Sequence, residues 1–122
     1  MNWCGRGLLK SPIRYGLCLS QIDYDTALIK LGMESEPWLS KGAEAVSHFI
    51  DCGDKVRVIV CLKMKRRPIE KPYSILIHEA VHVWQEIREY IGESKAGDEQ
   101  EAYCIEQIAY NLMMAYKNRM GN

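Results

Sequence analysis

The chain has 122 residues, 48% of them apolar, and its 16 basic side chains balance 16 acidic ones. This size and composition predict a single globular domain over residues 1–122 and argue against an intrinsically disordered chain. The formal net charge of zero argues against a protein whose main task is to bind nucleic acid or an anionic membrane.

Targeting and membrane signals are not evident. Glycines, Pro12 and charged residues interrupt the first 20 residues, which therefore lack the apolar centre of a signal peptide. No stretch approaches the roughly 20 apolar residues of a membrane-spanning helix. The five cysteines are scattered and form no C-x-x-C pair, which is typical of reduced thiols. We expect a cytoplasmic protein.

The N-terminal part, residues 1–43, predicts one strand and one short helix. Residues 13–19 form the strand, and Ser20 with Asp23 three positions later is typical of a helix N-cap. Gly32 suits the C-terminal end of that helix. A loop then covers residues 33–43.

Residues 44–64 predict a β-hairpin. The segments 44–50 and 56–64 are rich in β-branched side chains, and the sequence DCGDK between them has turn chemistry. In the second strand, Val56, Val58, Val60, Leu62 and Met64 share one face. The charged segment 65–71 is predicted to be a solvated loop rather than a nucleic-acid site.

Two longer helices complete the chain. Pro72 suits a first helical turn, so one helix is expected over about 72–91, ending near Gly92. The last helix is expected over about 98–118. The predicted fold class is α+β, with a small, mainly antiparallel sheet packed on these two helices.

The sequence HEAVH, residues 78–82, is the strongest motif in the chain. His78 and His82 lie about 40° apart on a helix, on the face opposite its apolar stripe. Two such imidazoles can bind one zinc ion, and Glu79 could then take a proton from a water on the metal. The alternative is a chance match on a solvated helix face.

Glu101 is the candidate third ligand. It heads the apolar stripe of the last helix, and a carboxylate aimed at the interior is costly unless it is paired or binds a metal. A capping box is the alternative, with Asp98 as the N-cap and Glu101 at the third helical position. Glu99 is the second candidate ligand, although it points nearly the opposite way.

The pattern His78-Glu79-x-x-His82, followed by Glu101, resembles the gluzincin branch of the zincin metallopeptidases. This resemblance implies a minimal zincin-like fold, with its metal-site core in residues 44–118. It implies zinc as the cofactor, His78, His82 and Glu101 as its ligands, Glu79 as the general base, and a protein or peptide as the substrate.

The wider text is similar to small zincin-like proteins of tailed phages and prophages. The stretches that carry this likeness are SHFI, VIVCL, HEAVHVWQ and GDEQEAY. The likeness implies a phage or prophage setting, in the cytoplasm of a bacterial host cell.

Departures from the family pattern leave two functions open. Ile105 stands where thermolysin-like enzymes have an aspartate that orients the first histidine, and we expect no counterpart of the family's downstream oxyanion histidine. His48 and Tyr103 are candidate replacements for the oxyanion donor, with Tyr73 and Tyr110 also considered. The first reading is a zinc-dependent peptidase, and the second is a weak or inactive zincin-fold interaction or assembly protein.

Larger zincins place the substrate cleft between two subdomains, and we expect too few residues after the last helix to form its second wall. Either residues 1–43 supply it or a second chain does, which would be another copy of this protein or a specific protein partner.

Overall fold

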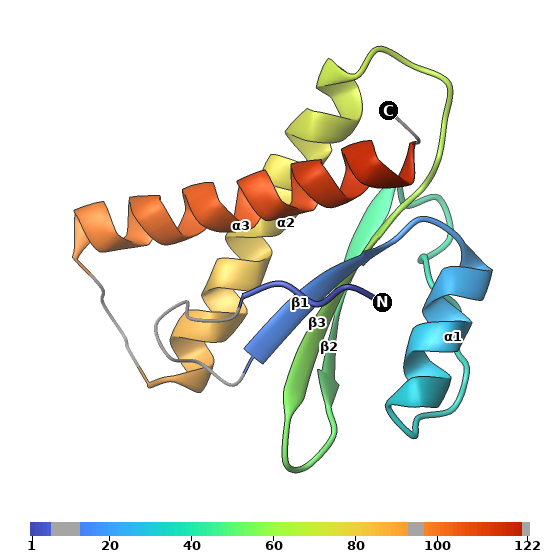
Figure 1. Ribbon diagram of the computed structural model, residues 1–122, viewed down its shortest axis with the longest axis horizontal. Coiled ribbons are helices and arrows are strands. Elements are labelled where there is room, and N and C mark those ends of the chain that lie inside the picture. The colour runs from blue at the N-terminus through green and yellow to red at the C-terminus, as the bar shows by residue number, and fades with distance from the viewer. Residues whose placement is uncertain (6–12, 93–96, 121–122) are drawn as a thin grey trace.

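The computed structural model describes residues 1–5, 13–92 and 97–120. Three strands and three helices follow in the order β1 (Ile13–Cys18), α1 (Gln21–Lys30), β2 (Ala45–Asp51), β3 (Val56–Leu62), α2 (Glu70–Tyr90) and α3 (Asp98–Arg119). Figure 1 shows α2 and α3 crossing on one side of the sheet and α1 lying on the other. The predicted α+β class is confirmed.

The three strands form one sheet in the order β1-β3-β2. β2 and β3 pair antiparallel, so the predicted hairpin is confirmed. β1 pairs parallel with β3, from Ile13 opposite Val56 to Cys18 opposite Cys61. The expectation of a mainly antiparallel sheet therefore needs correction, because the sheet is mixed. The chain passes from β1 through α1 and a long loop into β2, which runs antiparallel to β3, and the hairpin turn then brings β3 back in the same direction as β1.

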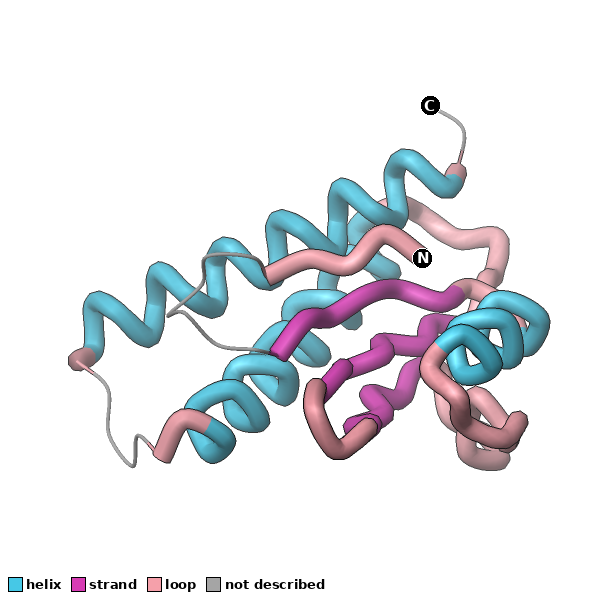
Figure 2. The backbone as a smooth tube through the Cα atoms, turned by 60° about the horizontal axis from the view of Figure 1, so that its bottom comes forward, coloured by secondary structure: helices cyan, strands magenta, loops and turns pink. Residues whose placement is uncertain are grey.

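Alternating side chains on β3 supply the two apolar cores of the protein. Val56, Val58, Val60 and Leu62 face α2 and α3 in the larger core. Ile59 and Cys61 face α1 in the smaller one. Figure 2 shows the sheet between these two helical layers. Met64, expected on the first face, lies beyond the strand and is exposed.

The two long helices pack against each other through their apolar stripes. Leu76, Ala80, Val83 and Ile87 of α2 are fully buried, as are Ile108 and Leu112 of α3. α2 begins two residues before Pro72, which still falls in the first turn, where a missing N–H costs no hydrogen bond. The predicted ranges of both helices are thus correct to within two residues.

Of the two predicted helix N-caps, one is confirmed and one is wrong. Ser20 caps α1, since its Oγ accepts a hydrogen bond from the Asp23 amide at 3.1 Å. The prediction for Asp98 is wrong, because Gly97 occupies the N-cap position of α3 and no side chain caps that end. Asp98 is instead the first residue of the helix, where its carboxylate faces the positive end of the helix dipole.

None of the helices in the described ranges combines the length and the apolar character that crossing a membrane would require.

Candidate metal centre

The two histidines of the HEAVH motif lie one turn apart on the exposed side of α2. Their Nε2 atoms are 3.2 Å apart, and the ring centroids are 4.8 Å apart at an interplanar angle of 74°. Both imidazoles are exposed, which agrees with the expectation that they point away from the apolar stripe. The structure thus brings His78 and His82 together.

Gln85 orients the second imidazole, a role that the sequence reasoning missed. Its Oε1 lies 3.1 Å from Nδ1 of His82. An amide oxygen only accepts, so in this contact Nδ1 of His82 is the donor and Nε2 is the ring nitrogen that carries the lone pair, which faces His78. The three-residue spacing from His82 to Gln85 on a helix is the signal that could have indicated the contact.

Glu79 is the buried acid of this region, with 6% of its surface exposed. Ser47 of β2 donates its hydroxyl to Glu79 Oε1 at 2.6 Å. Ser47 lies opposite Val60 of β3, whose side chain faces α2, so Ser47 points to the same face. Its contact with Glu79 offsets part of the cost of burying a carboxylate. The candidate base therefore lies between the helix and the edge strand, with Oε1 already bonded.

Glu101 lies on a different side of α2. Its Oε2 accepts hydrogen bonds from Trp84 Nε1 at 2.8 Å and from Arg88 at 3.3 Å. At about 100° per residue, Trp84 lies roughly 120–160° around α2 from the two histidines. The structure does not bring the Glu101 carboxylate to the imidazoles.

The other predicted ligand, Glu99, is exposed in the first turn of α3, beside Asp98. Within residues 1–5, 13–92 and 97–120, no group of three His, Cys, Asp or Glu side chains is placed to hold a metal ion. The donor set that the structure assembles is therefore the pair of imidazoles.

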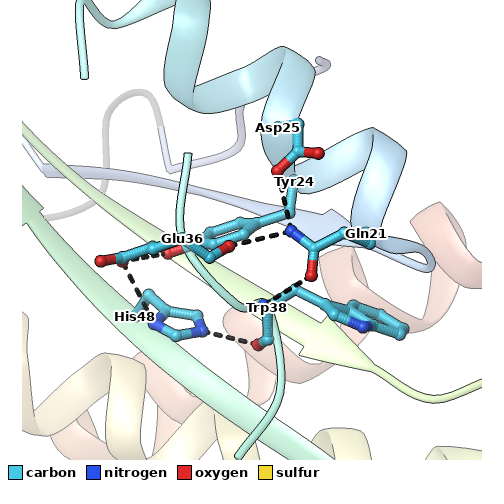
Figure 3. Close-up of polar contacts among 6 residues, drawn as sticks. All are labelled: Gln21, Tyr24, Asp25, Glu36, Trp38 and His48. Atoms are coloured by element: carbon cyan, nitrogen blue, oxygen red, sulfur yellow. Dashed lines mark hydrogen bonds and ion pairs between the residues drawn. The ribbon is translucent and has the colours of Figure 1, made fainter. Parts of the chain in front are cut away.

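His48, the candidate oxyanion donor, lies on the opposite face of the sheet (Figure 3). Its Nε2 contacts the Trp38 carbonyl oxygen at 2.7 Å, and its ring stacks on Tyr24 with centroids 4.6 Å apart. Side chains alternate on β2, so His48 faces α1 while Ser47 faces α2. The assignment of His48 to the site needs correction, since the sheet separates it from His78 and His82.

The tyrosines considered as replacements are also placed elsewhere. Tyr103 and Tyr110 lie on the outer side of α3, 57% and 59% exposed. Tyr73 packs edge to face on Tyr116, with ring centroids 6.2 Å apart. None of the three lines the hollows beside the histidines.

Two surface hollows meet at His78 and Glu79. One, of about 400 Å³, extends past Glu44 and Ile75. The other, of about 380 Å³, runs between α2 and β2 past His82 and Glu86. A ligand in either hollow would contact both an imidazole and the buried carboxylate.

No protein-family model, curated protein or solved structure matches this chain.

Proposed function

We propose that this protein is a zinc-dependent hydrolase that acts on peptides. The observation that carries the proposal is the 3.2 Å separation of the two Nε2 atoms. Zinc binds imidazole nitrogens at about 2.0–2.1 Å in tetrahedral geometry, which places two such nitrogens about 3.3–3.4 Å apart. His78 and His82 fit that requirement with little movement. Glu101 does not, because it is bonded to Trp84 and Arg88.

A bound zinc ion supplies a Lewis acid and a water of lowered pKa. Glu79 then acts as the base, taking a proton on one carboxylate oxygen and later giving it to the leaving amine. Ser47 occupies Oε1, whereas Oε2 accepts no hydrogen bond from the described residues. That oxygen is the one available for the proton, and Ser47 holds the carboxylate in place.

The position of β2 supports a peptide substrate. In the described ranges β2 is an edge strand, which pairs with β3 along one side and with no strand along the other. Its Ser47 contacts Glu79, so the strand runs directly beside the candidate base. An extended peptide can add to such an edge through main-chain hydrogen bonds, which would set a scissile bond beside α2.

A second candidate function is an interaction or assembly protein. The placement of Glu101 favours it, because two imidazoles alone form an incomplete zinc site. Under this proposal the surface around His78 and His82 binds a partner without hydrolysis.

Metal analysis is the test of the first proposal. Wild type, His82→Ala and Glu101→Ala are supplied with zinc and dialysed, and the metal per chain is measured. We expect zinc in wild type, its loss in His82→Ala and its retention in Glu101→Ala. Loss in both variants would instead establish Glu101 as the third ligand. No zinc in wild type would reject the metal site and favour the interaction protein.

Activity is tested separately, with peptides as substrates. Glu79→Gln should retain zinc and lose hydrolysis, because an amide cannot accept the proton. Glu70→Gln, an exposed change in the first turn of the same helix, is the matched control and should keep both. Hydrolysis that survives Glu79→Gln would disprove the proposed base.

A further inference from the structure

The hollow between α2 and β2 combines apolar walls with a carboxylate. Phe49 and Val58 are direct partners on adjacent strands and supply the apolar part. Glu86 lines the same hollow from α2, one turn beyond His82. Apolar strand residues on one side and an acid on the other match a side chain that has a hydrocarbon stem and a positive head.

Glu86 is half-buried, and within the described part of the chain its carboxylate has no hydrogen bond or ion pair. Among the residues that the structure describes, no lysine or arginine lines this hollow. A partly desolvated carboxylate gains most from a cationic ligand when no protein cation already neutralises it.

Glu44, the acid of the other hollow, is in the opposite situation. It accepts hydrogen bonds from Lys65 and Arg67. These two cations hold the pKa of Glu44 at about 2, well below its usual range. Glu44 therefore has no uncompensated charge to offer a ligand. Glu79 lines both hollows, so Glu86, which lines only the second, is the carboxylate that distinguishes the two.

We propose that the Glu86 hollow is the specificity pocket for a lysine or arginine side chain of a peptide substrate. This inference rests on the proposed peptidase function. Glu86 lies four residues, about 6 Å, along α2 from His82. The four-carbon stem of a lysine is of similar length, so a residue bound beside the imidazoles would set its ammonium group at Glu86.

Peptide binding tests the pocket without requiring hydrolysis. The probes are three capped tripeptides, acetyl-Ala-X-Ala-amide, in which X is lysine, norleucine or glutamate. Chemical-shift titrations measure their affinity for the Glu79→Gln variant, so that no probe is cleaved. We expect the lysine peptide to bind roughly three- to fivefold more tightly than the norleucine peptide, as for a partly exposed ion pair.

A second substitution in that background identifies the residue responsible. Glu86→Gln should abolish the preference for lysine, and Glu86→Lys should transfer it to the glutamate peptide. Glu89→Gln, an exposed change on the same helix outside the hollow, should leave the preference unchanged. Equal affinity for lysine and norleucine, or a lysine preference that survives Glu86→Gln, would overturn the proposal. An unchanged amide spectrum confirms that each variant is folded.

Cleavage by zinc-loaded wild type separates this proposal from the proposed function. A lysine preference in binding, with no hydrolysis of any peptide, would support the Glu86 pocket as a binding site and reject the peptidase function. Hydrolysis with no preference for basic residues, in a defined peptide mixture, would leave the peptidase and reject the pocket.

Discussion

Tyr15 is a single residue whose ionisation is coupled to stability. Its side chain is fully buried, and its hydroxyl oxygen accepts a hydrogen bond from Asn111 Nδ2 at 2.8 Å. Burial of the phenol raises the pKa of Tyr15 to about 12. Below pH 10 both folded and unfolded chains keep the proton, so the full stability is present. The part of the stability that depends on the Tyr15 proton is lost as pH rises from 10 toward 12, because only the unfolded chain then releases that proton.

Tyr15→Phe should be about 1 kcal/mol less stable than wild type at pH 7, through loss of the Asn111 hydrogen bond. Between pH 10 and 12 wild type should lose up to about 1.4 kcal/mol per pH unit that the variant does not lose. The difference in unfolding free energy between wild type and Tyr15→Phe should therefore shrink above pH 10 and change sign near pH 11. Urea unfolding of both proteins from pH 7 to 11 measures it. A difference that stays constant over this range would contradict a raised pKa.

Glu101 shows how far single residues could be placed from the sequence. The helix period put it correctly on the interior face of α3, and it put His78 and His82 correctly on the exposed face of α2. The two apolar stripes pack against each other, so Glu101 contacts Trp84 and Arg88 instead of the histidines. Glu101 lies on the face of α3 that packs against α2, whereas the histidines lie on the exposed face of α2. These two placements together predict that the carboxylate and the imidazoles lie apart. The motif spacing, in contrast, favoured the prediction that Glu101 and the two histidines bind one metal ion.

At the scale of elements, the ends of α1 and α3 differ in how they are capped. Ser20→Ala should lower stability by about 1 kcal/mol, because the Asp23 amide loses its acceptor. Asp98→Ala should cost only a few tenths of a kcal/mol, since Asp98 makes no cap and contributes only through the helix dipole. Thermal unfolding of the two variants and wild type provides the measurement. Equal losses would show that Asp98 caps α3 after all.

All six elements could be predicted from local patterns, because strand alternation, helix period and turn residues depend on neighbours in sequence. The Asp98 cap could not, since Gly97 and Asp98 both suit a helix start and only the backbone decides between them. The position of His48 required one more fact, namely which face of β2 meets α2. Ser47 and His48 are adjacent, so a prediction for one fixes the opposite face for the other.

At the scale of the whole molecule, β3 is the centre. It is hydrogen-bonded to strands on both sides, and helical layers cover both of its faces. α1 covers the smaller core and leaves Ile22 and Ile29 76% and 68% exposed. We expect backbone amides of β3 to exchange with deuterium most slowly and those of α1 much sooner. Native-state hydrogen exchange measures this order, and equal protection of the two elements would contradict it.

The parallel pairing of β1 with β3 could not be obtained from the sequence. A short strand before a helix and a loop is compatible with either edge of the hairpin and with either direction. Only the register in the folded sheet decides, and it depends on contacts between residues more than 40 positions apart.

That same pairing has a consequence for the order in which the fold forms during synthesis. Ile13 leaves the ribosome 43 residues before its partner Val56. β2 and β3, by contrast, are separated by a turn of four residues and can pair as soon as both have emerged. β1 is therefore synthesised before the hairpin strands but joins the sheet after they have paired. Within the described residues, Cys4 is the one pairing partner of β1 that precedes the hairpin in the chain, through its bridge to Tyr15.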